Sequence, residues 1–294
     1  MEGHCPMRVL VAGCGYVGNA LARRLVAAGH EVHGLRRRIE ALPPGVHPVA
    51  ADLAAPDLPA LPVVDALVYT ASAGGRTEEA YRTIYVDGLR RVIERLEASG
   101  SALERVIFTS STAVYGQTGG EWVDETSATE PASFSGRILL EAEAVAIAHG
   151  RHGVALRLAG IYGPGRTRLV RQVFEDQPSD SPDDAFGNRI HVDDCAGALA
   201  HLLELPSPAA VYCGVDDAPV PLGEVRDHLA AALGVARQRN RSHTGTERGH
   251  KRVSNARLVG SGYALSVPTY REGYGPVVEA FLRGEGRTEG RIQS

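Results

Sequence analysis

The sequence is short of cysteine and has no long apolar run. Its four cysteines, Cys5, Cys14, Cys195 and Cys213, are widely scattered, and no pair has the spacing of a metal site. A chain of 294 residues also needs no disulfide framework to fold. We therefore expect free thiols in a reducing compartment and no bound metal. No stretch approaches the ~20 apolar residues that span a bilayer, and the N-terminus lacks the basic segment of a signal peptide. These absences predict a cytoplasmic protein without a membrane partner.

No charge of one sign dominates the chain. Lysine and arginine number 31 against 35 aspartates and glutamates, which gives a formal net charge of -4. A nucleic-acid or membrane-surface partner usually requires a basic excess, so we expect neither. Apolar residues are abundant instead, at 44% of the chain, which is enough for a sizeable core.

Short apolar runs alternate with longer segments of helical periodicity through the first two thirds of the chain. The expected strands are Arg8–Ala12, Glu31–Leu35, Val46–Ala50, Ala66–Tyr69, Arg105–Ser110, Val154–Leu158 and Ala210–Cys213. The expected helices are Val17–Ala28, Glu78–Ser99, Arg137–Ala148 and Val192–Leu205. This alternation predicts an α/β fold with a Rossmann-type, doubly wound parallel sheet.

After Ile161 the alternation weakens. The acidic, proline-containing segment Phe174–Ala185 and the basic segment Arg237–Arg252 predict surface loops, and residues from Gly284 onward are expected to fray. Two further helices are expected, at Leu222–Leu233 and Pro276–Leu282. We expect a dinucleotide-binding domain over 1–160, to which 191–216 return. A small C-terminal substrate lobe would then be formed by 161–190 and 217–294.

A glycine-rich turn stands between the first expected strand and the first expected helix. In a dinucleotide site the first glycine permits the turn, the second lets the backbone approach a pyrophosphate, and the third lets the helix pack on the strand. The N–H groups at the start of the helix then face the phosphates. A tight turn without a ligand is the alternative, but the strand–turn–helix context favours cofactor binding. The candidate cofactor-binding residues here are Gly13, Gly15, Tyr16, Val17 and Gly18.

The second strand ends in Leu35-Arg36-Arg37-Arg38 and carries no acidic residue. An acid at this point would bind the ribose 2′-hydroxyl of NAD, whereas an arginine accommodates the 2′-phosphate of NADP. We therefore favour NADP over NAD, with Arg36 as the contact; a solvated basic turn is the alternative. The further cofactor candidates follow the third and fourth strands and are Asp52, Leu53 and Thr70. For Asp52, an ordinary turn aspartate is the alternative.

Three further motifs accompany the glycine turn, and together they resemble one family. They are TSSTAVYG at Thr109–Gly116, RLAGIYGPGR at Arg157–Arg166 and NRIHVDD at Asn188–Asp194. With these motifs the chain resembles the short-chain dehydrogenase/reductase superfamily, and within it the NAD-dependent epimerase/dehydratase group. The GxGxxG spacing differs from the TGxxGxxG of most extended members and resembles the atypical subgroups.

The resemblance implies catalytic positions, and this sequence fills only some of them. Ser111, four residues before Tyr115, corresponds to the family residue that bonds the reacting oxygen of the substrate; a serine bonded to its own backbone is the alternative. The family's Tyr-x-x-x-Lys pair, in which the lysine lowers the pKa of the tyrosine, falls on Ser135 and Leu139. Both members are missing, and a serine without a base is a poor proton donor.

Substitutes for the missing pair and the substrate contacts complete the expected site. Tyr115, Tyr162 and His191 are the available acid–base groups, although we expect Tyr162 to pack over the nicotinamide or substrate and His191 to be structural. Family members often act on nucleotide-diphosphate sugars, whose phosphates require cations. The candidate cations, for which solvated surface residues are the alternative, are Arg166, Arg189, Lys251 and Arg252.

Two functions therefore fit the sequence. One is an NADP-linked epimerase or reductase with a displaced proton donor and a small-molecule substrate, such as a nucleotide sugar. The other is a catalytically silent protein that senses NADP(H) or acts as a scaffold. Because family members are often dimers, the resemblance also implies a homodimer through helices equivalent to Glu78–Ser99 and Arg137–Ala148.

Overall fold

A parallel seven-stranded sheet organises the chain, and the computed structural model describes residues 6–177, 181–239 and 250–285. Strand β1 pairs in parallel with β2 on one side and with β4 on the other. The order across the sheet is β11-β7-β5-β4-β1-β2-β3, so the topology reverses beside β1, where open α/β sheets bind their ligands. The strands are β1 (Arg8–Ala12), β2 (Glu31–Arg36), β3 (His47–Ala50), β4 (Ala66–Tyr69), β5 (Arg105–Ser111), β7 (His152–Leu158) and β11 (Val211–Gly214). The expected Rossmann-type fold is confirmed.

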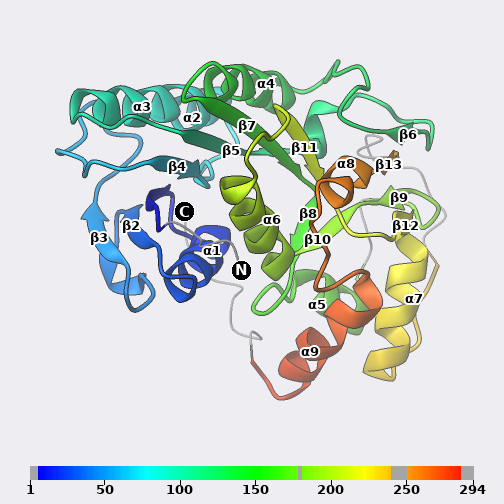
Figure 1. Cartoon of the computed structure of the whole chain (residues 1–294). Helices are drawn as coiled ribbons and strands as arrows, with labels where there is room; N and C mark the ends of the chain where they lie inside the picture. The colour runs from blue at the N-terminus through cyan, green and yellow to red at the C-terminus, as the bar shows by residue number, and fades with distance from the viewer. Residues whose placement is uncertain (1–5, 178–180, 240–249, 286–294) are drawn as a thin grey trace. The chain divides into compact units, whose positions relative to one another are not determined.

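Helices cover both faces of this sheet (Figure 1). One face carries α2, α3 and α4, and the other carries α1 and α6. The bounds are α1 (Tyr16–Ala27), α2 (Glu78–Arg82), α3 (Leu89–Ala98), α4 (Phe134–Ile147) and α6 (Val192–Glu204). Strands covered on both faces must be apolar along their whole length, and accordingly all residues from Val9 to Ala12 and from Ala66 to Tyr69 are completely buried.

The expected helix Glu78–Ser99 is interrupted by a π-helical segment, Thr83–Gly88. The hydroxyl of Tyr69, which ends β4, donates to the carbonyl oxygen of Ile84 at 2.6 Å. A side chain inserted into the hydrogen-bond ladder of a helix widens it in this way. Gly88 is required at the same place, because a Cβ there would lie 2.7 Å from the Tyr69 hydroxyl.

The chain divides into two interleaved units. The first comprises Met1–Val114, Thr129–Arg157 and Cys195–Tyr212, and the second comprises Tyr115–Ala128, Leu158–Asp194 and Cys213–Ser294. These bounds differ from the expected ones chiefly in that 115–128 belong to the second unit. That segment contributes β6 (Trp122–Val123), which pairs in parallel with β13 (Arg252–Val253).

The second unit has its own apolar core. The side chains of α5, α7 and α9 meet there, together with buried aromatic residues such as Tyr162 and Phe281. Short strand pairs, β8 with β10 and β9 with β12, complete the unit. The bounds are β8 (Gly160–Tyr162), α5 (Arg168–Phe174), β9 (Phe186–Gly187), β10 (Arg189–His191), β12 (Val220–Pro221), α7 (Leu222–Leu233), α8 (Ala256–Gly260) and α9 (Tyr270–Leu282).

The expected start of the last helix at Pro276 is wrong. Helix α9 begins at Tyr270, because Thr269 and Glu272 form a capping box in which the Glu272 carboxylate accepts the Thr269 N–H at 3.1 Å. Pro276 therefore lies inside the helix, where it supplies no N–H to the ladder. Helix α4 also begins earlier than expected, since the Ser133 hydroxyl caps it by accepting the Gly136 N–H at 3.3 Å. The expected fraying after Gly284 falls largely on residues outside the described part.

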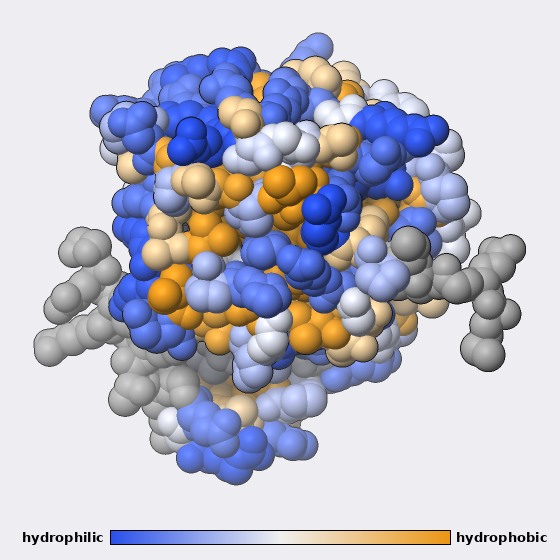
Figure 2. Space-filling model, turned by 60° about the vertical axis from the view of Figure 1, so that its left-hand side comes forward, coloured by the Kyte–Doolittle hydropathy of each residue, from blue (hydrophilic) through white to orange (hydrophobic). Residues whose placement is uncertain are grey.

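Large apolar side chains on the surface are scattered. Those exposed among the described residues are Val63, Trp122, Ile147, Phe174, Val259 and Leu282. On the face that Figure 2 presents, apolar surface lies among hydrophilic residues. In the part of the chain that the structure describes, no helix combines the length and apolar content that crossing a membrane requires.

Candidate functional site

The glycine turn joins β1 to α1, and two of its glycines are required by the packing of the protein itself. Gly13 has a φ of +86°, and a Cβ there would lie 2.4 Å from the backbone nitrogen and Cα of Ala71. A Cβ at Gly18 would lie 2.7 Å from the Thr70 hydroxyl and 2.9 Å from the Gly13 carbonyl oxygen. These contacts fix the close approach of β1, α1 and the end of β4.

Gly15 is different, because no atom of the described residues excludes a side chain from it. The nearest atom to a Cβ at this position would be the Gly13 carbonyl oxygen, 3.7 Å away. Helix α1 begins here with no side-chain cap and no acidic residue in its first turn. Its first N–H groups and its positive dipole end therefore suit an anion. The open space at Gly15 and the uncapped helix fit the pyrophosphate of a dinucleotide.

Arg36, the last residue of β2, lies against this turn. Its Nη1 donates to the carbonyl oxygen of Cys14 at 3.0 Å and to that of Ala41 at 3.1 Å. The preceding residue, Leu35, accepts the backbone N–H groups of Gly13 and Cys14 at 3.0 and 3.1 Å. The guanidinium is thus held beside the glycines by one of its nitrogens. The others keep N–H donors that no described residue accepts.

The remaining cofactor candidates of the first unit have mixed settings. Thr70 donates its hydroxyl hydrogen to the Gly13 carbonyl oxygen at 2.9 Å, so it supports the turn. Asp52 is exposed and accepts the Ala54 N–H at 3.0 Å. This hydrogen bond is the one that an ordinary turn aspartate makes, the alternative to ligand binding. Leu53 is buried, and its carbonyl oxygen accepts from Arg91 at 2.7 Å. Tyr16 and Val17 form the first turn of α1.

Ser111 and Ser135 both belong to the first unit. Ser111 ends β5, is half-buried, and accepts the Ala113 N–H at 3.2 Å, which leaves its hydroxyl hydrogen for another acceptor. Ser135 lies in the first turn of α4, 2.9 Å from the Ser133 hydroxyl. Gly136 lets the start of α4 pack against the turn after Ser111, since a Cβ there would lie 2.8 Å from the Ala113 carbonyl oxygen.

The two tyrosines considered as substitutes are core residues of the second unit. Tyr115 is 3% exposed, and its hydroxyl lies 3.1 Å from the Cys213 sulfur. Tyr162 is 4% exposed, stacks on Tyr274 at 4.6 Å between ring centroids, and donates to the Thr269 carbonyl oxygen at 3.2 Å. Burial raises the pKa of Tyr162. Such surroundings favour a structural role for both tyrosines, and the expected contact of Tyr162 with cofactor or substrate stays a prediction.

His191 also packs in the second unit, edge-on to Tyr162 at 5.3 Å. Its Nδ1 accepts the Asp193 N–H at 3.3 Å. Burial lowers the pKa of His191, so the ring is neutral at neutral pH. These surroundings favour a structural role over acid–base work.

The three candidate arginines have different environments. Arg189 is 5% exposed, lies 5.5 Å from the Tyr270 ring centroid and donates to the Ala218 carbonyl oxygen at 3.4 Å. This burial favours a packing role in the second unit, and the expected substrate contact of Arg189 stays a prediction. Arg166 is exposed and donates to Ile161 at 3.4 Å. Arg252 lies over two aromatic rings, those of Trp122 and Phe186.

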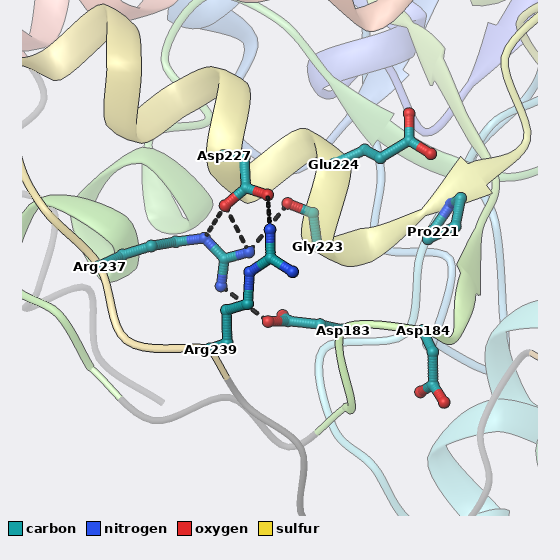
Figure 3. A pocket seen from close by; sticks show the side chains of 8 residues that line it. All are labelled: Asp183, Asp184, Pro221, Gly223, Glu224, Asp227, Arg237 and Arg239. Carbon is teal, nitrogen blue, oxygen red and sulfur yellow. Dashed lines mark hydrogen bonds and ion pairs between the residues drawn. The ribbon is translucent and has the colours of Figure 1, made fainter.

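A cavity of about 520 Å³ in the second unit has no counterpart in the sequence-based site. Figure 3 shows Arg237 reaching into it, where the guanidinium donates to Asp227 at 2.7 Å, Asp183 at 2.8 Å and the Gly223 carbonyl oxygen at 3.0 Å. Arg226 holds the other Asp183 oxygen at 2.6 Å. The signal in the sequence was the opposite charge of the acidic segment before Ala185 and the basic segment after 236.

Comparisons with known proteins agree with this architecture. The model of the NAD-dependent epimerase/dehydratase family matches residues 9–214. A solved structure from Methylobacillus flagellatus, assigned to the NAD-dependent epimerase/dehydratases, is 39% identical, with a TM-score of 0.81 over 95% of this chain and 100% of that one. Protein YeeZ of Escherichia coli is 32% identical over 219 residues, which are 70% of this chain and 76% of that protein.

A more distant relative carries an enzyme name. The 2-alkyl-3-oxoalkanoate reductase of Stenotrophomonas maltophilia is 29% identical over 263 residues, which cover 79% of this chain and 77% of that protein. Within the described residues, no group of three or more histidine, cysteine or acidic side chains could hold a metal ion. The sheet order, the glycine turn and the match over residues 9–214 lead to one conclusion: the chain belongs to the NAD-dependent epimerase/dehydratase family.

Proposed function

We propose that this chain is an NADP(H)-dependent oxidoreductase or epimerase of the epimerase/dehydratase type. The observation that carries the proposal is the pairing of an open Gly15 with an Arg36 guanidinium fixed beside it. The first leaves room for a pyrophosphate, and the second offers a cation and unused N–H donors for a 2′-phosphate. An NAD site would require an acid where Arg36 stands.

The residues of this chain suit a carbonyl or secondary-alcohol substrate. When bound, NADP(H) supplies or accepts the hydride. Ser111 has its hydroxyl hydrogen available to donate to the substrate oxygen. Ser135 occupies the position of the family's tyrosine, and we assign it the handling of the proton, in exchange with solvent through the neighbouring Ser133 hydroxyl. A serine pair is weakly acidic, so turnover should be slow compared with that of relatives that hold a phenol there.

The cofactor assignment is tested by titrating NADPH and NADH against wild type, Arg36→Asp and Arg36→Lys. The wild type should bind NADPH at least about tenfold more tightly than NADH, a difference of about 1.4 kcal/mol. Arg36→Asp should abolish or reverse this preference, because the new carboxylate repels a 2′-phosphate. Arg36→Lys keeps the charge and should retain part of it. An unchanged preference in Arg36→Asp would remove the proposal for NADP.

Turnover is tested by following NADPH oxidation with carbonyl substrates. The relatives suggest two classes, 2-alkyl-3-oxoalkanoates and nucleotide-diphosphate sugars, the latter because a neighbour of the same fold, MoeE5, was solved with UDP-glucose and NAD. Ser111→Ala should lower kcat at least about tenfold without changing NADPH affinity, since it removes a hydrogen bond to the reacting oxygen. Turnover that survives in Ser111→Ala would locate the chemistry elsewhere.

A second candidate function is a catalytically silent NADP(H) sensor or scaffold. The observation that favours it is the absence of a proton-transfer pair, since Leu139 is buried where a lysine would stand and the hydroxyls of Tyr115 and Tyr162 are engaged in the core. Tight NADPH binding without turnover on either substrate class would favour this function over the enzyme.

A further inference from the structure

Arg252 contacts two aromatic rings in the second unit. Its guanidinium carbon lies 5.2 Å from the Trp122 ring centroid and 4.8 Å from that of Phe186. The pairing of β6 with β13 sets Trp122 directly opposite Arg252, and the Arg252 Nε donates to the Gly120 carbonyl oxygen at 2.8 Å. Two cation–π contacts and one hydrogen bond therefore fix the plane of the guanidinium.

The outer side of Phe186 is supported as well. Phe186 stacks on His250 at 5.5 Å with an interplanar angle of 17°, and its N–H donates to the His250 Nδ1 at 3.2 Å. Gly120 closes the group with a φ of +80°, where a Cβ would come within 3.0 Å of the His250 Nε2. The fold therefore already restricts the Arg252 side chain, and ligand binding would not have to supply the entropic cost of ordering it. A binding site with this property is preorganised.

Two features of this group remain unused by the fold. The Nη1 and Nη2 groups of Arg252 donate to no described residue, because its one hydrogen bond, to Gly120, is made through Nε. Trp122 is 56% exposed although Arg252 covers part of it. A guanidinium fork is suited to bidentate binding of an oxyanion, and an exposed indole is suited to stacking on a planar ring.

The charged side chains next to Trp122 and Arg252 in sequence each bond to the backbone. The carboxylate of Glu121, next to Trp122 in sequence, accepts the Gly119 N–H at 2.7 Å. Lys251, the residue before β13, is buried. It donates to the Tyr115 carbonyl oxygen at 2.9 Å, so it is part of the interior. Of the adjacent residues Lys251 and Arg252, Arg252 is the one that is partly exposed.

We propose that Trp122 and Arg252 form a binding site for an aromatic anion, in which Arg252 holds a phosphate or carboxylate and Trp122 stacks on the ring that carries it. Phe186 and His250 act as positioning residues that keep the guanidinium in place. The site lies wholly in the second unit, and the proposal does not depend on the binding of NADP(H).

The chain offers a direct reporter, because Trp122 is its single tryptophan. Intrinsic tryptophan fluorescence of the full chain is titrated with phenyl phosphate, benzoate, inorganic phosphate and benzyl alcohol. Phenyl phosphate or benzoate should change the emission saturably, and the stronger of the two identifies the preferred oxyanion. Inorganic phosphate lacks the aromatic ring and benzyl alcohol lacks the oxyanion. Each should therefore bind at least about tenfold more weakly.

Variants separate recognition from simple charge. Arg252→Gln and Arg252→Lys should each weaken phenyl phosphate at least about tenfold, the second because lysine keeps the charge but lacks the fork. Arg271→Gln is the matched control, since Arg271 is exposed and lies over one ring, 5.0 Å from the Tyr270 centroid, and its loss should leave affinity unchanged. Far-UV circular dichroism verifies the fold of each variant. An emission that ignores both aromatic anions, or equal affinity in wild type and folded Arg252→Lys, would overturn the proposal.

Discussion

Alanine at Gly13 and alanine at Gly15 should separate what the glycine turn does for folding from what it does for a ligand. At Gly13 the φ of +86° places an alanine in the left-handed region, which costs about 1–2 kcal/mol. Its Cβ would also overlap the backbone of Ala71 at 2.4 Å, and overpacking of this kind costs about 1–3 kcal/mol. The sum, about 3 kcal/mol, should lower Tm by about 6–12 °C for a chain of this size.

At Gly15 the same substitution meets no protein atom closer than 3.7 Å. The loss of a glycine at this N-cap should cost less than about 1 kcal/mol, or at most about 4 °C in Tm. The methyl group would instead fill the space that we assign to a pyrophosphate. NADPH affinity should therefore fall at least about tenfold.

The assay pairs thermal melts followed by circular dichroism, without cofactor, with NADPH fluorescence titrations of the same samples. The reasoning on packing is refuted if Gly13→Ala melts with the wild type, because the turn must then relax at little cost. The reasoning on the ligand is refuted if Gly15→Ala binds NADPH as tightly as wild type. The two variants carry the same substitution at different glycines of one turn, so each serves as the control for the other.

Two further predictions concern buried charge. Burial raises the pKa of Asp216 to about 7, so the folded state holds a proton that the unfolded state releases at lower pH, and this group's contribution to stability falls as pH rises from about 4 to 7. Asp216→Asn should therefore gain stability relative to wild type across that window, by up to about 4 kcal/mol; a constant difference in Tm from pH 4 to 7 would contradict it. Arg157 donates to the buried carboxylate of Glu143 at 2.7 and 2.9 Å, so Arg157→Met should cost about 3–5 kcal/mol in urea unfolding. The double variant with Glu143→Leu should recover most of that loss, and no recovery would refute an electrostatic cause.

Much of the fold was predictable because its signals are local. Apolar runs bounded by turn residues gave the strands of the main sheet within two residues. The signal is clearest for β1 and β4, whose residues from Val9 to Ala12 and from Ala66 to Tyr69 are completely buried and apolar. The π-helical segment was not predictable in this way. It depends on the Tyr69 hydroxyl reaching Ile84, a contact between residues that only the folded sheet brings together. The early start of α9 could have been found, because Thr269 and Glu272 have the capping-box spacing.

The same distinction, between local signals and contacts formed only on folding, applies to the candidate site. The glycine turn and Arg36 are adjacent through the pairing of β1 and β2, which the order of strands already implies. The sequence could not show that the side chains of Tyr115, Tyr162 and Arg189 are buried. A motif gives a residue's position along the chain and not the burial of its side chain. Burial changes their chemistry: it raises the pKa of Tyr162, whose hydroxyl donates to the Thr269 carbonyl oxygen, and so disfavours proton exchange.

The interleaving of the two units has a consequence for synthesis. The first unit needs its segment Cys195–Tyr212, which is translated after the second unit has begun at Tyr115. Domains generally fold as units while the chain emerges at about 5–20 residues per second. Here the sheet stays without β11, its last strand, and with an open edge until residue 214 has left the ribosome. The nascent chain thus spends several seconds with an exposed β7 backbone, an interval in which a chaperone or a misplaced strand can pair with it.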